Sequence, residues 1–247
     1  MFAQINELIK VIDDAVWGLP LICLIMVTGI LLTVRLGGVQ VRHLGKAFKF
    51  MFQDEEDGHG EVTSFGALCT ALSATIGTGN IAGVATAIAA GGPGALFWMV
   101  VAAFFGMATK YSEGLLAIKY RTIDQDGHVL GGPFYYIENG MGKKWKWLAK
   151  IFAFFGAGVG LFGIGTFTQV NSIASAVKNF FDPDMAHTVT VLGNDYSIAT
   201  VIAGILLTVF VGLVVIGGIK RISKVSEVVV PFMAVLYVVL CLIIVFT

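Results

Sequence analysis

The residues of this chain whose types and spacing could do chemistry lie together at Ser73–Gly83, in the order Ser-Ala-Thr-Ile-Gly-Thr-Gly-Asn-Ile-Ala-Gly. They interrupt a hydrophobic stretch that is long enough to cross a bilayer. Lipid cannot hydrogen-bond a loosened backbone, so glycine and polar residues at that depth must face protein, water or a ligand. In membrane proteins, interruptions of this kind indicate an ion or substrate site.

An unwound turn at this point would expose backbone groups that a helix normally satisfies. Gly77 and Gly79 tolerate open dihedral angles and allow a ligand to approach the backbone. Unwinding frees carbonyl oxygens that can coordinate a hard cation such as Na⁺, and the candidates are those of Ser73, Thr75 and Ile76. The helix that restarts near Asn80 presents free N–H groups to a carboxylate. The Asn80 side chain adds a carbonyl oxygen for the ion or an amide group for the substrate.

Two other interpretations of the same residues differ in strength. Gly77-x-Gly79-x-x-Ala82 formally matches a dinucleotide-binding fingerprint, but no βαβ pattern surrounds it and no acidic residue follows about 20 positions on. Close helix packing through a ladder of small residues is the stronger alternative, since Ala71, Thr75 and Gly79 form such a ladder. Packing alone does not require Asn80 beside two glycines and two threonines. Ligand binding is therefore favoured, and packing stays open.

The elements that must position these residues are membrane spans. The chain is 57% hydrophobic and 13% charged, whereas soluble domains are about 25% charged. Several nearly uncharged segments can each cross a hydrocarbon core of about 30 Å. The zero net charge gives no sign of a nucleic-acid partner, and the three cysteines have no metal or disulfide spacing. We predict an all-α polytopic membrane protein with six spans: Val16–Val34, Phe65–Ala90, Ala95–Ala117, Leu148–Val177, Ile198–Ile216 and Val225–Phe246.

The basic residues predict how these spans are oriented. Thirteen of the 16 Lys and Arg residues fall on one side of the membrane, in or beside the segments 35–64, 118–147 and 217–224. The positive-inside rule makes that side cytoplasmic and places the N-terminus outside. The acidic run Asp54–Asp57 fits a solvated loop, and an interfacial helix is expected from Pro133 onward.

Other polar residues within the spans have weaker signals. Gln169 is either a ligand contact or part of a helix–helix hydrogen bond. Lys110 and Glu113 lie three residues apart on one helix face and fit a structural ion pair, with a gate or proton site as the alternative. Close packing is the favoured reason for the glycines of the fourth span, and a flexible element the other: Gly156, Gly158, Gly160, Gly163 and Gly165. No nucleophile–base set or paired carboxylates indicate an enzyme.

Several motifs resemble those of one known family, the sodium:alanine (alanine or glycine:cation) symporters. Ala74-Thr-Ile-Gly-Thr-Gly-Asn-Ile-Ala-Gly-Val-Ala-Thr-Ala87 is similar to the first core helix of that family. Gly91-Gly-Pro-Gly-Ala-Leu-Phe-Trp-Met99, with Phe104-Phe-Gly106 after it, resembles the family signature. Gly132-Pro-Phe-Tyr-Tyr136 and Gly165-Thr-Phe-Thr-Gln169 also fit. The resemblance runs from about residue 15 to the end of the chain.

The resemblance implies a leucine-transporter-type (LeuT) fold, in which two inverted five-helix repeats enclose a midplane site and the first helix of each repeat is broken. Residues 1–15 would then be an amphipathic N-terminal segment, 16–34 an extra helix, and 65–247 the first repeat, broken near 75–80. Thr75 and Asn80 resemble ion and substrate ligands, and the carbonyl groups of Ser73 and Ile76 would serve a second ion. Thr78 and Gly79 would meet an amino-acid carboxylate, with Gln169 contacting the substrate.

The implied function is Na⁺-coupled symport of a small neutral amino acid, alanine or glycine, by alternating access and without any cofactor beside the ion. The plasma (inner) membrane of a prokaryote is the implied location. Family members are nearly twice as long, and the second repeat is absent from these 247 residues. We therefore expect an N-terminal fragment whose C-terminal half is a missing partner. A non-transporting half-transporter with a structural or regulatory role is the alternative.

Overall fold

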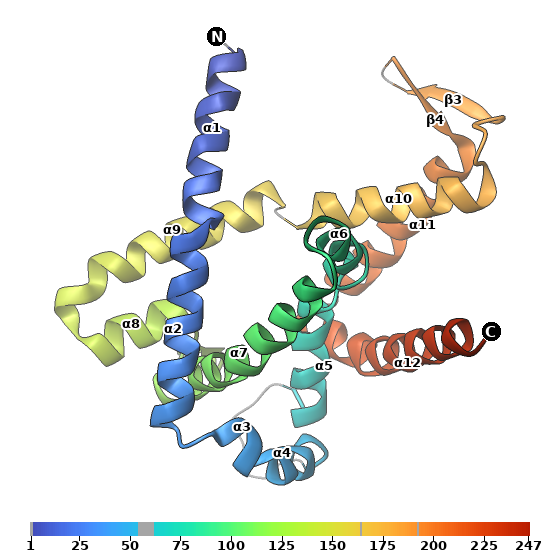
Figure 1. The fold of residues 1–247 in the computed structure, drawn as a ribbon. Helices are drawn as coiled ribbons and strands as arrows, with labels where there is room; N and C mark the ends of the chain where they lie inside the picture. The colour runs from blue at the N-terminus through green and yellow to red at the C-terminus, as the bar shows by residue number, and fades with distance from the viewer. Residues whose placement is uncertain (1, 54–61, 164, 192) are drawn as a thin grey trace. The chain divides into compact units, whose positions relative to one another are not determined.

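The computed structural model describes residues 2–53, 62–163, 165–191 and 193–247. The acidic run Asp54–Asp57 lies outside the described residues. The described chain is built almost wholly of helices (Figure 1). It divides into two compact units, one formed by Met1–Lys49 with Thr86–Phe152 and the other by Phe50–Ala85 with Ala153–Thr247.

The first unit is organised around two long apolar helices. Helix α1 (Phe2–Trp17) leads into α2 (Leu19–Arg35), which packs against α7 (Pro93–Lys119). Gly29 allows the close approach, because a Cβ there would come 3.0 Å from the Cβ and carbonyl oxygen of Phe105. Short helices α3 (Val39–Arg42) and α4 (Leu44–Met51) follow α2. The hairpin of β1 (Thr122–Ile123) and β2 (Val129–Leu130), helix α8 (Pro133–Met141), η2 (Lys143–Trp145) and the start of α9 (Lys146–Phe162) follow α7.

The second unit holds the interrupted segment. Helix α5 (Ser64–Thr75) is followed by η1 (Thr78–Asn80) and α6 (Ala82–Gly91), and α5 packs against α12 (Gly218–Phe246). Helix α10 (Thr166–Phe181) packs on α11 (Ile198–Val215), which in turn contacts α12. The antiparallel hairpin of β3 (Thr188–Val191) and β4 (Asn194–Ser197) connects α10 with α11.

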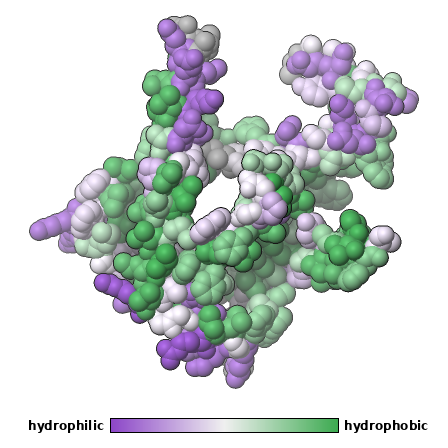
Figure 2. All heavy atoms as spheres, in the orientation of Figure 1, coloured by the Kyte–Doolittle hydropathy of each residue, from purple (hydrophilic) through white to green (hydrophobic). Residues whose placement is uncertain are grey.

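The helices meet the expectation of a polytopic membrane protein. Five helical segments of the described chain are long and apolar enough to cross a membrane: Gln4–Arg35, Pro93–Lys119, Lys143–Phe181, Ile198–Val215 and Gly218–Phe246. A bent pair, Ser64–Thr75 with Thr78–Gly91, raises the number to six when it is counted as one span. Hydrophobic side chains cover much of these helices in Figure 2, whereas α1 and the β3–β4 hairpin carry hydrophilic surface. Lipid-facing helices need such an apolar exterior.

The fourth predicted span, Leu148–Val177, falls within the candidate span Lys143–Phe181 but is divided between two helices. Instead of one continuous helix over Leu148–Val177, α9 ends at Phe162 and α10 begins at Thr166. Gly163 has φ +59° and Gly165 has φ +91°, left-handed values that end a helix and that glycine adopts without strain. The described residues give no support to the packing interpretation of the neighbouring glycines, since outside the helix's own backbone none of their atoms lies within 4 Å of a Cβ built at Gly156, Gly158 or Gly160.

The two small hairpins were not predicted. Gly127 has φ +81° between β1 and β2, and Gly193 has φ +83° between β3 and β4. Asp126-Gly127 and Gly193-Asn194 are turn dipeptides that the sequence shows openly. The strands themselves are too short to leave a period-2 pattern.

Asp182 ties the end of α10 to the second hairpin. Its buried carboxylate accepts hydrogen bonds from the Ser197 hydroxyl (2.7 Å), the Ala186 N–H (2.7 Å) and the His187 N–H (3.4 Å). The bond from Ser197, helped by the backbone donors, holds the pKa of Asp182 below its ordinary value although burial opposes this. The ionised carboxylate is therefore the form that stabilises this connection.

Replacing Asp182 by Asn should loosen residues 185–197, because the negative charge and one accepting oxygen are lost. Hydrogen exchange should show lower protection factors there, while Asp184→Asn, an exposed neighbour, leaves them unchanged. A folded-state pKa below the unfolded value of about 3.9 means that the stabilisation is complete above that pH and is lost as the pH falls through the folded pKa. In the wild type these protection factors should fall on acidification. In Asp182→Asn they should not change with pH. The same pH dependence of the protection factors in both proteins would contradict the role given to Asp182.

Candidate functional site

The interruption at residues 76–81 bends the second span. Helix α5 ends at Thr75, α6 begins at Ala82, and the two parts are inclined by 71° (Figure 1). Ile76 has ψ 111° and Gly77 has φ −142° and ψ −166°, both extended conformations. Two extended residues in sequence cannot continue an α-helix, so the chain leaves α5 and re-enters helical geometry through the single 3₁₀ turn of η1.

The turn satisfies part of its own backbone. The Asn80 N–H donates to the Gly77 carbonyl (3.0 Å) and the Ile81 N–H to the Thr78 carbonyl (3.2 Å). The Gly77 N–H donates to the Asn80 side-chain oxygen at 3.0 Å. Asn80 therefore holds the turn with its Oδ1 atom and keeps its amide NH₂ group for another acceptor.

Four carbonyl oxygens on the α5 side have no such partner, and one of them is that of Ala74. The last α5 bond runs from the Ile76 N–H to the Leu72 carbonyl (2.7 Å). In the described part of the chain, no hydrogen bond is made to the carbonyl oxygens of Ser73, Thr75 or Ile76. These are the oxygens that the sequence predicts as ligands of a cation.

The hydroxyl groups beside them keep acceptor capacity. Thr75 Oγ1 donates to the Ala71 carbonyl (2.8 Å), and Ser73 Oγ donates to the Thr70 carbonyl (2.7 Å). A hydroxyl group that donates its hydrogen still has two lone pairs. With its hydrogen directed back along α5, each oxygen can face a cation.

Gln169 lies against the interruption. It belongs to the first turn of α10, whose start follows the positive-φ residue Gly165. A Cβ built at Gly77 would come 3.0 Å from Gln169 Nε2, whereas one built at Gly79 would meet nothing within 4 Å. Gly77 thus provides the space that the Gln169 amide group occupies. The fold brings together two segments separated by about 90 positions in the sequence.

The assembled site is polar and uncharged. The predicted residues from Gly77 to Asn80 lie in one turn, Gln169 contacts that turn, and Ser73 and Thr75 lie on the last turn of α5 before it. The side chains of Thr75, Asn80 and Gln169 are exposed in this chain. No ionisable side chain is among them, and the described residues contain no group of three His, Cys, Asp or Glu that could hold a metal ion. Such a set can bind a hard cation through oxygens and a carboxylate through N–H groups.

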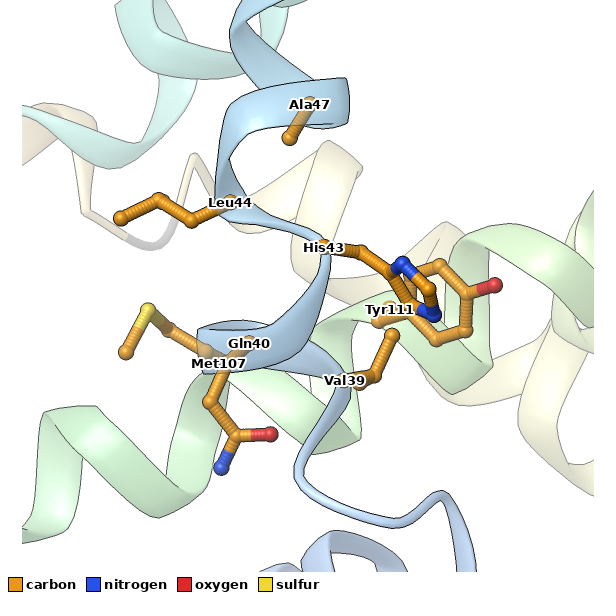
Figure 3. A pocket seen from close by; sticks show the side chains of 7 residues that line it. All are labelled: Val39, Gln40, His43, Leu44, Ala47, Met107 and Tyr111. Atoms are coloured by element: carbon orange, nitrogen blue, oxygen red, sulfur yellow. The ribbon is translucent and has the colours of Figure 1, made fainter.

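A second feature lies elsewhere, in the first unit. An apolar pocket of about 220 Å³ lies between α3–α4 and α7, with His43 and Tyr111 at one side (Figure 3). Its lining contains none of the predicted site residues: Val39, Gln40, His43, Leu44, Ala47, Met107 and Tyr111.

Sequence reasoning missed Glu227. It lies on α12 within a candidate span, and Thr63 Oγ1 at the start of α5 donates to its Oε1 atom at 2.8 Å. A carboxylate at the start of the apolar run of a span was the available signal, because ionisable residues within spans are functional candidates by default. Lys110 and Glu113, by contrast, form the expected ion pair at 3.0 Å.

A broken membrane-spanning helix, with unsatisfied carbonyl groups at the break and a polar side chain from another helix beside it, is characteristic of secondary transporters. The comparisons give the family. The model of the sodium:alanine symporter family matches residues 2–247, and the chain belongs to this family. The motif resemblance noted in the sequence is thereby confirmed.

Named relatives extend the comparison. An uncharacterised transporter of Haemophilus influenzae is 51% identical over 98% of this chain and 49% of its own length. The sodium/alanine symporter AgcS of Methanococcus maripaludis is 48% identical over 94% of this chain and 49% of its length. A probable sodium/glutamine symporter, GlnT of Bacillus subtilis, is 34% identical over 95% of this chain and 45% of its length. The chain spans about half the length of the curated relatives that it matches.

The two glycines of the turn provide a matched test of the packing. Gly77→Ala should displace the Gln169 amide group and lower the free energy of unfolding by about 1 kcal/mol, the low end for overpacking because a side-chain terminus can shift. Gly79→Ala meets open space and should leave the thermal midpoint unchanged. Thermal unfolding of the detergent-solubilised protein measures both. Equal midpoints for the two variants would refute the contact between Gly77 and Gln169.

Proposed function

We propose that the protein mediates Na⁺-coupled symport of a small neutral amino acid, with alanine or glycine as the substrate, by alternating access. The observation that carries the proposal is the uncharged interruption at residues 76–81. Among the described residues, no hydrogen bond is made to the carbonyl oxygens of Ser73, Thr75 and Ile76 or by the N–H groups of Thr78 and Gly79. Membership in the sodium:alanine symporter family and the similarity to AgcS support the choice of ion and substrate.

The roles follow from the chemistry of each group. The carbonyl oxygens of Ser73 and Ile76 and the hydroxyl oxygen of Thr75 bind Na⁺. The N–H groups of Thr78 and Gly79 and the Asn80 amide group face the amino-acid carboxylate, which the positive N-terminal end of the following helix also favours. Gln169 contacts the substrate from α10. No chemical conversion is needed, so the protein is proposed to be a transporter and not an enzyme.

The wider architecture is part of the proposal. A leucine-transporter-type arrangement would make residues 65–247 the repeat that carries the broken helix, after an amphipathic segment and an extra helix. This chain then supplies one wall of the ligand site, which fits the exposure of Thr75, Asn80 and Gln169. Membership in the sodium:alanine symporter family supports a location in the plasma membrane of a prokaryote. The distribution of basic residues supports an N-terminus outside.

Asn80→Ala should abolish most amino-acid binding. The variant loses the amide group and also the acceptor that holds the Gly77 N–H, and a hydrogen bond to a charged group contributes about 1.5–3 kcal/mol. The expected effect is at least about a tenfold weaker apparent affinity for alanine. Uptake of labelled alanine into proteoliposomes that contain the complete gene product, under a Na⁺ gradient, measures it.

Asn139→Ala is the matched control, because Asn139 makes a single hydrogen bond to the Tyr120 carbonyl on the first unit. Uptake by Asn80→Ala that equals uptake by Asn139→Ala would remove Asn80 from the site. A wild-type protein that takes up alanine equally well with Na⁺ replaced by choline would overturn Na⁺ coupling.

Thr75→Val should weaken the dependence on Na⁺ specifically. Valine keeps the branched shape and removes the oxygen, so the Na⁺ concentration for half-maximal uptake should rise about tenfold, as expected for the loss of about 1.4 kcal/mol. Thr208→Val is the control, because Thr208 makes the same kind of bond to the carbonyl four residues before it, also at 2.8 Å. A Na⁺ requirement unchanged by Thr75→Val would exclude the hydroxyl as a ligand.

A further inference from the structure

Glu227 is a carboxylate that directly precedes the apolar run Val228–Phe246. It lies in α12, inside the candidate span Gly218–Phe246, and is half-buried. Within the described residues, no Lys or Arg forms an ion pair with it, unlike Glu113, which is paired with Lys110. An ionised carboxylate in a span needs a partner that offsets its desolvation.

The Glu227 carboxylate faces the beginning of α5. Thr63 is the N-cap of α5, and its hydroxyl oxygen accepts the Gly66 N–H at 2.9 Å. The same hydroxyl group donates to Glu227 Oε1 at 2.8 Å. The carboxylate thus lies beside the positive end of the α5 dipole, which attracts it with only a partial charge.

Gly66 shows how closely these groups converge. A Cβ at this buried residue would collide with both Glu227 Oε1 and Ser223 Oγ, and it would lie 2.9 Å from Thr63 Oγ1. Three oxygen atoms from two helices therefore surround the same small space beside the α5 backbone. A residue with any side chain would fill it.

Ser223 provides an independent observation. Its side chain is 3% exposed and its Oγ atom has no hydrogen-bond partner among the described residues. A buried hydroxyl group without a partner costs about 1–3 kcal/mol, and such groups call for a bound water or ion. This hydroxyl oxygen faces the space that Glu227 and Thr63 share.

We propose that Glu227, Ser223 and Thr63 form a Na⁺ site of their own, separate from the interruption at residues 76–81. Carboxylate and hydroxyl oxygens are the ligands that hard cations prefer. The ion neutralises Glu227 and gives Ser223 Oγ its partner, while the half-exposed carboxylate allows entry from water. Pro231 also lacks the N–H that would bond the Glu227 carbonyl, which loosens α12 beside the site.

Na⁺ bound at this site would also influence the other end of α5, where the interruption begins. Thr63 and Thr75 are separated by about 18 Å of helix, so the two sites do not share ligands. Na⁺ bound between Thr63, Ser223 and Glu227 joins the start of α5 to α12. It thereby fixes the helix whose last turn carries Ser73 and Thr75.

Binding of ²²Na⁺ to the complete purified gene product, without amino acid, tests the proposal. Glu227→Gln should weaken one class of Na⁺ site by about tenfold or more, since a charge-assisted ligand is lost. Ser223→Ala should weaken the same class by a smaller factor, and it keeps the test valid if Glu227→Gln fails to fold. Glu113→Gln, the same change at a paired carboxylate, and Ser226→Ala, a buried serine on the same helix, should bind as the wild type does.

Four outcomes would overturn part of the proposal or of the proposed function. Wild-type ²²Na⁺ binding in both Glu227→Gln and Ser223→Ala would overturn the site. If Glu227→Gln altered only the pH dependence of alanine uptake, the Na⁺ site would also be overturned, because the occupant would then be a proton. Asn80→Ala should keep the Glu227-dependent ion and lose alanine binding. Loss of that ion in Asn80→Ala would refute the separation of the two sites, and a wild-type protein that binds this ion but never alanine would overturn the proposed function alone.

Discussion

A backbone group that leaves its helix inside a membrane must find another partner in the protein or in a ligand, because lipid provides none. The turn at residues 76–81 meets this constraint only in part. Asn80 satisfies the Gly77 N–H and the 3₁₀ turn satisfies two carbonyl groups, but no described residue donates to the carbonyl groups of Ser73, Ala74, Thr75 and Ile76. These carbonyl groups all lie on the α5 side of the turn. The Na⁺ proposed to bind there is a partner that matches carbonyl and hydroxyl oxygens.

Polar side chains from other helices contact α5 or its flanking residues at both ends. At the break, Gln169 from α10 fills the space beside Gly77, which only a residue without a Cβ leaves open. At the far end, Thr63 caps α5 and bonds Glu227 of α12. Gly66 allows the approach of Glu227 in the same way, because it has no Cβ. Glycine therefore acts here through the close approach of a neighbouring polar side chain, and not through unusual dihedral angles, since neither Gly77 nor Gly66 has positive φ.

The spans could be predicted from the sequence because a lipid bilayer requires long apolar segments. The interruption could be predicted because Ser73–Gly83 contains polar residues and glycines within such a segment. The break at Gly163–Gly165 could not, because glycine fits tight packing and a helix end equally well until φ is known. The contact of Gln169 with Gly77 joins residues from distant segments, and only family resemblance suggested a common site. Glu227 was overlooked because one carboxylate next to Lys220, Arg221 and Lys224 looks like the polar end of a span.

The lack of fixed charge at the break has a thermodynamic consequence for the proposed symport. A site of dipoles alone leaves a bound Na⁺ or a bound carboxylate without a counter-charge in a medium of low dielectric constant, where attraction between unit charges is strong. Each ligand then supplies what the other needs, so the two bind together more tightly than separately, and the coupling free energy is the same in both directions. The Glu227 site carries its own negative charge and needs no amino acid. The two proposed cation sites should therefore differ in one measurable property: only the one at the break is strengthened by substrate.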